Sequence, residues 1–376
     1  MSDATSLPDL GFLIGPEDDY VPPEAPAFDV EDALGADDDG VWPEITVPGG
    51  AFGEPSAWED APASFVPVWD EPRRPGVDPD SLTRGLNDRQ REAVTHAGSP
   101  LLILAGAGSG KTRVLTHRIA YLLATGRAWA GQILAITFTN KAAAEMRERV
   151  TALVGPAGAR MWVSTFHSAC VRILREQAHL LPGLNTNFTI YDADDSKRLL
   201  GMIAKDLQIN AQKFPPRLLA AAISALKTEL TDPDAASDEA AATRNPFDRT
   251  IAEVYTEYQR RLRAANALDF DDLIGETVRV FITHPEIAAY YRKRFRHVLI
   301  DEYQDTNHAQ YVLISTLVGT GSDASELSVV GDSDQSIYAF RGATIRNIEE
   351  FERDYPQART ILLEQNYRST QNILSA

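Results

Sequence analysis

The feature that most constrains this chain is the stretch PLLILAGAGSGKTRVL at residues 100–115. An apolar run of strand character ends in a glycine-rich turn, and a helical pattern follows. Gly106, Gly108 and Gly110 let such a turn curl so that its backbone N–H groups point inward at anionic oxygens. The N-terminus of the following helix adds a partial positive charge. The stretch therefore predicts a strand–loop–helix unit that holds the phosphates of a nucleotide.

The loop matches the pattern G-x-x-x-x-G-K-[ST] except at its first position, where Ala105 replaces glycine. In this pattern Lys111 reaches the β- and γ-phosphates and Thr112 binds Mg²⁺. An incidental lysine in a structural turn is the alternative, but the strand before and the helix after the turn argue against it. The predicted nucleotide-binding residues of the loop are Ala105, Gly106, Ala107, Gly108, Ser109, Gly110, Lys111 and Thr112.

Apolar runs alternate with helical stretches over the rest of the chain, which is typical of a parallel sheet wrapped by helices. The runs resemble strands that are buried on both faces. We therefore expect an α/β fold. The predicted strands are PLLILAG, QILAITFT, MWVSTF, HVLIDE, LSVVGD and TILLEQ.

Residues 166–294 differ in character, because they are mostly helical. We interpret them as a helical domain inserted into the α/β domain. Within this block TDPDAASDEAAATRNP, at residues 231–246, is expected to be an exposed loop. The basic runs QRRLRAAN and YYRKRFRH are either phosphate contacts or solvated helix faces.

A phosphate-binding loop needs an acidic partner at the tip of another strand, and RHVLIDEYQDT supplies one. Asp301 would hold Mg²⁺, and Glu302 would orient and deprotonate the attacking water. The carboxyl ends of strands are where ligands bind in open α/β sheets. An ordinary acidic turn after a strand is the alternative, which the presence of the phosphate loop disfavours.

Several long motifs follow one another along the chain. Together, and in this order, they resemble the motifs of the UvrD/Rep/PcrA group of superfamily 1 DNA helicases, the PcrA type most of all. The resemblance runs from about Leu86 to Ala376. The motifs are LNDRQREAV, AGAGSGKT, TFTNKAAAEM, STFH, DFDDL, IDEYQDT, VGDSDQSIYAFRGA and LEQNYRST.

The resemblance implies a RecA-like P-loop NTPase domain (domain 1A) and a particular division of the chain. Domain 1A would comprise residues 85–165 and 295–361. An inserted helical subdomain (1B) would span 166–294, and a second RecA-like domain (2A) would begin at 362–376.

The resemblance also assigns further ATP contacts. Gln90 would read the adenine edge, although Asn87-x-x-Gln90 also fits a helix cap. Arg113 would lie beside the nucleotide. Gln335 corresponds to the family's γ-phosphate sensor. Tyr367 would stack on adenine, and Arg368 would contact the γ-phosphate.

For DNA, the resemblance implies that Phe138 stacks on a base while Thr137, Thr139 and Asn140 touch the strand's backbone. Helix capping is the alternative for this stretch. Core packing is the alternative for Tyr338, and a structural role is the alternative for His167. Phe340 stands where the group usually has Trp, yet it still offers a face for stacking. The remaining implied DNA contacts are Phe166, His167, Tyr338, Phe340 and Arg341.

The implied activity is that of an ATP-dependent 3′–5′ DNA helicase or translocase acting on single-stranded DNA and on single-strand/double-strand junctions, in repair or replication. The sequence stops at Ala376, within the helical stretch NILSA, so we expect the N-terminal half of a longer helicase that cannot unwind DNA alone. The alternative is a module that holds nucleotide and single-stranded DNA without moving.

Acidic residues are concentrated at the start of the chain. The formal net charge is −18, yet residues 1–80 contain 20 of the 54 acidic residues and only two of the 36 basic ones, Arg73 and Arg74. The remaining chain is therefore neutral, and a basic groove for nucleic acid stays possible.

Cys170 is the only cysteine, which excludes an intrachain disulfide and fits a reducing cytosol. No apolar run approaches the roughly 18 residues of a membrane helix, so we expect a cytoplasmic protein without membrane contact.

Residues 1–84 are predicted to be a disordered acidic tail, because they contain 13 of the 22 prolines and lack the periodicity of a packed element. A solvated tail is one interpretation. The other is a docking segment, because Trp42, Trp58 and Trp69 lie among the acids. The hypothesis is that the tail binds a protein partner or competes with nucleic acid for the body of the chain. Deletion of residues 1–80 tests it through DNA affinity and partner binding.

Overall fold

The computed structural model describes residues 76–332 and 346–367. Trp42, Trp58 and Trp69 of the predicted tail therefore lie outside the described residues. None of the described helices is both long and apolar enough to cross a bilayer.

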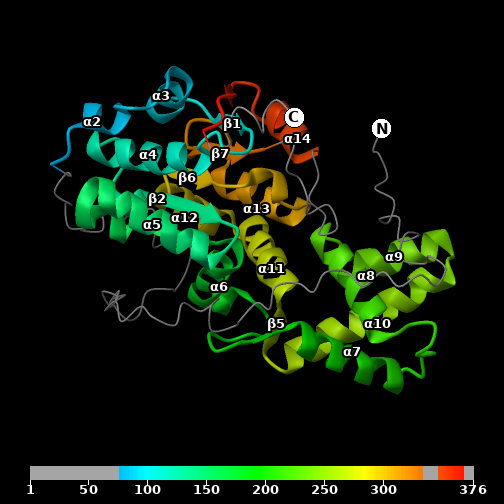
Figure 1. Cartoon of the computed structure of the whole chain (residues 1–376). Coiled ribbons are helices and arrows are strands. Elements are labelled where there is room, and N and C mark those ends of the chain that lie inside the picture. The colour runs from blue at the N-terminus through cyan, green and yellow to red at the C-terminus, as the bar shows by residue number, and fades with distance from the viewer. Residues whose placement is uncertain (1–75, 333–345, 368–376) are drawn as a thin grey trace, which may run out of the picture.

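A parallel sheet of six strands, in the order β3-β2-β6-β7-β1-β8, forms the centre of the described fold (Figure 1). The predicted α/β fold is confirmed, and all six predicted runs are strands of this sheet. Because all the strands run in one direction, their carboxyl ends lie along one edge, where the predicted site residues are expected to meet. The strands are β1 (Leu101–Ala105), β2 (Ile133–Thr137), β3 (Trp162–Thr165), β6 (His297–Ile300), β7 (Glu326–Gly331) and β8 (Arg359–Leu363).

The strands read as continuous apolar runs because both faces of the sheet are covered. In β1, Leu101 and Ile103 belong to the hydrophobic cluster on one face, and Leu102 belongs to the cluster on the other. All five residues of β2 are buried. Alternation of side chains between the two faces, combined with burial on both, leaves no polar face to interrupt the run.

Helices from the first half of the chain cover one face of the sheet. Val114 and Ile119 of one of them, and Met146 and Val150 of another, are fully buried there. Asp88 begins the helix that carries Gln90, and Asn87 caps it. The helices of this face are α2 (Pro79–Thr83), α3 (Asp88–Thr95), α4 (Lys111–Ala124) and α5 (Asn140–Val154).

A fully buried arginine holds α3 against the sheet. The Arg118 guanidinium donates to the carbonyl oxygens of Ala93 (2.9 Å) and His96 (2.8 Å) at the end of α3. It also pairs with Glu326 of β7 at 2.5 Å. Burial lowers the pKa of Arg118 to about 10, and the charge of Glu326 works against that shift. The arginine therefore fixes the end of α3, the helix that carries Gln90.

The other face of the sheet is covered by helices from the two ends of the predicted helical block and by a helix that follows β6. Cys170, Leu174, Leu273 and Val278 are buried against this face. Phe351 of α14 (Arg346–Asp354) joins the same cluster. The main helices of this face are α6 (Phe166–Glu176), α11 (Phe270–Thr283), α12 (Pro285–Arg294) and α13 (His308–Val318).

Four further helices have a hydrophobic cluster of their own, set apart from the sheet in Figure 1. Their core includes Ile203, Ile223 and Tyr258. Two short parallel strands join this part to the rest of the chain. The helices are α7 (Ala193–Asp206), α8 (Pro216–Thr228), α9 (Pro233–Thr243) and α10 (Pro246–Ala264), and the strands are β4 (Thr189–Tyr191) and β5 (Ala267–Asp269).

The packing divides the chain differently from the predicted helical block at 166–294. Helices α6, α11 and α12 lie within those bounds, yet they bury their apolar faces against the sheet. Only α7–α10 form the separate cluster. Helical periodicity cannot distinguish the two sets, because it shows that a helix has an apolar face but not what covers that face.

Three boundaries are corrected by the structure. Ordered chain begins before residue 85, since α2 starts at Pro79 and buries Leu82. The predicted exposed loop at 231–246 contains helix α9, in which Asp232 accepts a cap bond from the Ala235 N–H at 2.8 Å. Strand β8 pairs with β1 as far as residue 363, which extends the first sheet past the predicted boundary at 361.

A buried lysine connects the separate helices to α11. Lys227 of α8 pairs with Asp269 at 2.6 Å and with Asp272 at 2.8 Å. Its third donor bonds Gln259 of α10 at 3.1 Å. Burial disfavours the charged ammonium, but the two carboxylates outweigh it and hold the pKa of Lys227 above its usual range. This network is a polar link between the two hydrophobic clusters, and the ion pair of Arg263 on α10 with Glu276 on α11 is another.

We expect Lys227→Met to destabilise the chain by about 3–5 kcal/mol, because it leaves Asp269 and Asp272 buried without their cation. Chemical denaturation followed by circular dichroism measures the change. The matched control is Lys197→Met, whose exposed pair with Asp194 contributes at most about 1 kcal/mol. Equal effects of the two substitutions would contradict the role given to Lys227.

Candidate nucleotide site

The predicted phosphate loop lies between the end of β1 and the start of α4. Gly108 and Gly110 have φ angles of 75° and 88°, in the left-handed region that favours glycine. A Cβ on Gly110 would lie 3.1 Å from the Gln90 side-chain nitrogen. Ser109 closes the turn, since its N–H and its hydroxyl both donate to the Gly106 carbonyl, at 3.2 and 2.7 Å. The glycines are therefore required by backbone geometry and by close packing.

The N-terminus of α4 makes no side-chain cap bond. The first N–H groups of a helix have no partner within the helix, and its N-terminus carries a partial positive charge. Gly110, the N-cap residue, has no side chain that could accept a bond from them. This end of α4 can therefore bind an anion, as the sequence predicts.

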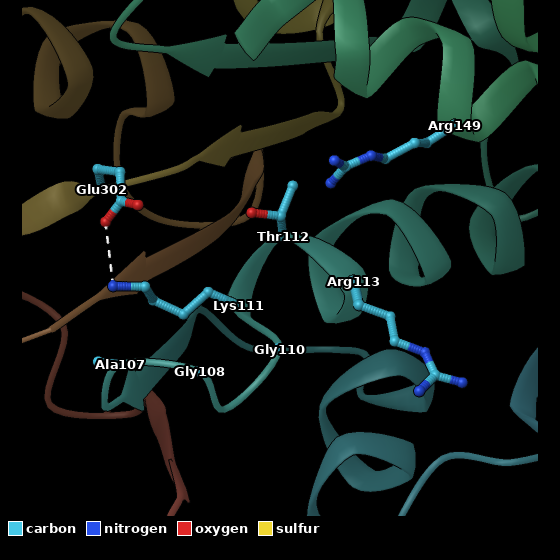
Figure 2. A pocket seen from close by; sticks show the side chains of 8 residues that line it. All are labelled: Ala107, Gly108, Gly110, Lys111, Thr112, Arg113, Arg149 and Glu302. Atoms are coloured by element: carbon cyan, nitrogen blue, oxygen red, sulfur yellow. Dashed lines mark ion pairs between the residues drawn. The ribbon is translucent and has the colours of Figure 1, made fainter. Parts of the chain in front are cut away.

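A cavity of about 320 Å³ opens in front of the loop. Figure 2 shows the paired Lys111 and Glu302 on one side of it, with Thr112, Arg113 and Arg149 on the other side. The lining residues are Ala107, Gly108, Gly110, Lys111, Thr112, Arg113, Arg149 and Glu302.

Lys111 is 9% exposed and is held by two carboxylates. Its Nζ lies 3.2 Å from Glu302 Oε2 and 3.3 Å from Asp332 Oδ2. The three residues follow β1, β6 and β7, which are neighbours in the sheet. The sequence singled out Lys111 and Glu302. It did not single out Asp332, although this residue lies in the quoted motif VGDSDQSIYAFRGA, directly after β7.

The tip of β6 carries two carboxylates in different environments. Glu302 has φ 50° and ψ 47°, a left-handed conformation that costs a non-glycine residue about 1–3 kcal/mol. Asp301 is 5% exposed, and its Oδ1 accepts the Glu302 N–H at 3.0 Å. Burial, with a smaller contribution from the charge of Glu302, raises the pKa of Asp301 to about 6. A nearby cation would favour the ionised form of this carboxyl group.

Gln90 is part of a capping box, as one of the two readings of its sequence expects. The Asn87 side chain accepts the Gln90 N–H at 2.8 Å, and Gln90 Oε1 accepts the Asn87 N–H at 3.2 Å. Its Nε2 also donates to the Ser109 carbonyl of the phosphate loop at 3.0 Å. The cap is therefore confirmed, and adenine recognition by Gln90 stays a prediction.

The segment after β8 lies against the phosphate loop. The Tyr367 N–H donates to the Gly108 carbonyl, and Asn366 Nδ2 donates to the Ala107 carbonyl, both at 2.9 Å. The Tyr367 hydroxyl accepts from Asn87 Nδ2 at 2.8 Å, and its side chain is largely exposed. The predicted adenine-stacking ring is thus next to the loop. Arg113 donates to the Gly85 carbonyl at 3.3 Å and also lines the cavity.

Sequence reasoning missed Arg149 as a cavity residue. It lies on α5 and pairs with Glu145 at 3.1 Å, with the i,i+4 spacing of an ordinary solvated helix pair. No motif marks it, because the fold alone turns this part of α5 toward the loop that follows β1. In Figure 2 its guanidinium extends toward the space beside Thr112.

The predicted DNA contacts at β2 and β3 lie at adjacent strand ends, since Thr137 is paired with Thr165 in the sheet. Thr139 caps α5 by accepting the Ala142 N–H at 3.1 Å, so the capping alternative is confirmed for it. Phe138 and Asn140 are only half-buried, whereas Thr137 is 1% exposed.

Phe166 and His167 are neighbours in the sequence but differ in how deeply their side chains are buried. Phe166 is 2% exposed and packs in the cluster between α6 and the sheet. The prediction that Phe166 contacts DNA is therefore corrected, because a side chain in the core has no face left for a base. His167 is half-buried, and its ring meets Phe270 edge-on at 5.6 Å. Its DNA contact stays a prediction.

The basic runs make intramolecular contacts. Arg292 donates to the carbonyls of Leu317 and Thr316 at the end of α13. Arg260 and Arg261 both pair with Glu257. These arginines are therefore engaged within the chain, and phosphate binding by the two runs stays a prediction.

Five predicted site residues lie outside the described part of the chain, and their predictions are neither supported nor contradicted by it. They are Gln335, Tyr338, Phe340, Arg341 and Arg368.

Comparison with known proteins adds a family match. The model of the UvrD/REP helicase N-terminal domain matches residues 86–356. The chain is 69% identical over 307 residues to the ATP-dependent DNA helicase UvrD1 of Mycobacterium tuberculosis. The matched stretch covers 80% of this chain and 40% of that protein. It is 50% identical over 295 residues to the ATP-dependent DNA helicase PcrA of Bacillus subtilis, covering 78% of this chain and 39% of that protein. The PcrA of Staphylococcus aureus is 53% identical over 296 residues, covering 79% and 40%.

The chain thus spans about 40% of the length of these relatives. Among these three relatives the identity to UvrD1 is higher than the identity to either PcrA, and both types belong to the group that the sequence motifs resemble.

We expect Arg149→Ala to weaken nucleotide binding about tenfold, which corresponds to one hydrogen bond to a charged group, about 1.5 kcal/mol. Titration with a fluorescent ATP analogue measures the affinity. Glu145→Ala is the control, since it removes the partner of Arg149 but keeps the cation. Unchanged affinity in the Arg149 variant would show that its guanidinium does not reach the ligand.

Proposed function

Because the chain belongs to the UvrD/REP helicase family, we propose that it binds and hydrolyses ATP in a DNA helicase that moves 3′–5′ along single-stranded DNA. One observation carries the proposal. The ammonium of Lys111 is held by Glu302 and Asp332 at a cavity that the glycine loop and the N-terminus of α4 line. The polarity is taken from the resemblance alone.

In this proposal the triphosphate lies over the loop, with its oxygens facing the N-terminus of α4. Lys111 exchanges its two carboxylate partners for the β- and γ-phosphates. Glu302, left beside the γ-phosphate, orients water and accepts its proton. A carboxylate held 3.2 Å from the lysine before the ligand enters lies close enough for this role.

The residues present fit Mg²⁺. Thr112 lines the cavity, and Asp301 supplies a buried carboxylate of raised pKa at the end of β6. Among the described residues no group of three or more His, Cys, Asp or Glu could hold a metal ion by itself. Mg²⁺ is commonly bound by one or two protein oxygens together with phosphate and water. Thr112 and Asp301 would hold the ion, and the bound ion would neutralise part of the phosphate charge.

Adenine recognition is proposed at the mouth of the loop, between α3 and the segment after β8. Tyr367 offers an exposed ring, and its hydroxyl is fixed by Asn87. The Gln90 amide lies close by, bonded to Ser109. Arg113 lines the cavity and donates to the Gly85 carbonyl, shortly before α3.

Single-stranded DNA is proposed to cross the carboxyl ends of β2 and β3. Phe138, Thr139, Asn140 and His167 are grouped there, and none of them is fully buried. An aromatic ring can stack on any base, which suits movement along DNA without sequence preference. Binding at single-strand/double-strand junctions, a protein partner for the tail and a cytoplasmic location remain part of the proposal.

We expect ATP hydrolysis that single-stranded DNA stimulates, and we expect Lys111→Ala to reduce it about 100-fold or more. The substitution removes the cation that would neutralise the phosphates, so DNA affinity should be unchanged. A phosphate-release assay and the fluorescence anisotropy of a labelled oligodeoxynucleotide measure the two properties, on this chain and on any longer natural form. Lys197→Ala, on the exposed surface of α7, is the control.

Turnover by the Lys111 variant equal to that of the unaltered chain would refute the proposed site. If the unaltered chain and any longer form bind nucleotide and DNA without turnover, the non-motor module is the correct function.

We expect Glu302→Gln to bind ATP but to hydrolyse it about 100- to 10,000-fold more slowly, because the amide keeps the size of the side chain and cannot accept the proton. Single-turnover hydrolysis of radiolabelled ATP separates the two steps. Glu145→Gln, on the exposed surface of α5, should hydrolyse ATP normally. A normal rate in the Glu302 variant would exclude this residue as the base.

A further inference from the structure

The turn after β6 contains a buried amide to which neither the sequence nor the proposed mechanism assigns a role. Gln304 lies in the short 3₁₀ turn Tyr303–Asp305 and is 3% exposed. Buried amides are stable only when their donors and acceptor are bonded. What Gln304 bonds therefore indicates what it does.

Both ends of the Gln304 side chain are used. Its Nε2 donates to Glu302 Oε2 at 2.9 Å and to Asp305 Oδ2 at 3.2 Å. Its Oε1 accepts the Asp332 N–H at 2.9 Å. One side chain thus joins the two residues that hold Lys111.

Gln304 and Lys111 share one oxygen of the proposed base. Glu302 Oε2 accepts from Gln304 and also lies 3.2 Å from the Lys111 ammonium. When Lys111 turns to phosphate oxygens, Glu302 loses one of these two donors. Gln304 remains, and its hydrogen bond keeps the carboxylate from following the lysine.

The glycine opposite this amide is consistent with a close fit. A Cβ at Gly331, the last residue of β7, would lie 3.3 Å from Gln304 Oε1 and 3.6 Å from the Tyr303 Cβ. The first distance would make the amide oxygen shift by a few tenths of an ångström, and the second is an ordinary van der Waals contact. The end of β7 and the turn after β6 therefore pack closely through the Gln304 side chain.

We propose that Gln304 is a positioning residue for ATP hydrolysis, which holds the Glu302 carboxylate in place and ties it to Asp332. The inference rests on the proposed function. Gln304 touches neither substrate nor water in this role and acts through Glu302. A residue that only stabilised the turn would change the stability of the chain, whereas a positioning residue changes the rate of the chemical step.

Two substitutions separate the two ends of the side chain. Gln304→Glu keeps an acceptor for the Asp332 N–H but replaces both donors with an oxygen that faces Glu302 and Asp305. Gln304→Met has a similar length and no strong hydrogen-bonding group. The control is Gln310→Met, because Gln310 is a buried glutamine that only completes the cap of α13.

We expect both Gln304 variants to lower kcat for ATP at least tenfold with the KM for ATP changed less than twofold. This division reports the loss of an interaction that matters in the transition state and not in substrate binding. Gln310→Met should lower the melting temperature and leave kcat within twofold. Steady-state phosphate release and thermal unfolding supply these values.

A kcat of Gln304→Glu within twofold of the unaltered chain would overturn the inference, and so would a raised KM with unchanged kcat. If either variant fails to fold, Gly331→Ala replaces it, because it keeps the amide and crowds its oxygen, and the same kcat loss is expected. Absence of hydrolysis in the unaltered protein counts against the proposed function. Hydrolysis that is insensitive to Gln304 counts against this inference alone.

Discussion

The ion pairs of Lys111 with Glu302 and Asp332 are the interaction on which the site depends. A lysine that is 9% exposed needs carboxylates beside it, because an unpaired charge in that position is strongly disfavoured. The three residues stand at the ends of β1, β6 and β7, which are adjacent in the sheet. An anion that enters the cavity offers Lys111 oxygens of the same charge, so ligand binding exchanges partners without leaving the ammonium uncompensated.

Two constraints would keep the Glu302 carboxylate in place when Lys111 exchanges partners. Glu302 has a left-handed backbone, a conformation that persists only where surrounding contacts hold it. Those contacts include the bond from its N–H to Asp301 and the bond from Gln304 to its side chain. The strain and the hydrogen bonds are found at one turn, which is the turn that would carry the chemistry.

The same edge of the sheet relates the two proposed ligands. Helix α5 begins at Asn140, beside the proposed DNA contacts, and carries Arg149 to the cavity. At about 1.5 Å per residue, the nine-residue step from Asn140 to Arg149 spans about 14 Å of helix. The helical cluster of α7–α10 is joined to this body through α11 and the buried Lys227. A parallel sheet thus places the residues that follow β1, β2, β6 and β7 along one edge, although these strands are far apart in the sequence.

The sequence by itself determined the strands, the phosphate loop and the acidic pair at 301–302, because each is encoded in a few consecutive residues. Burial on both faces makes a strand a continuous apolar run, and glycine is required where φ is positive. Only the tertiary structure decided that Arg149 lines the cavity, that Asp332 and Gln304 complete the site, and that Phe166 belongs to the core. It also decided which helices of the predicted block pack on the sheet. These properties depend on what lies opposite a side chain across tens or hundreds of residues, and local periodicity contains no information about that partner.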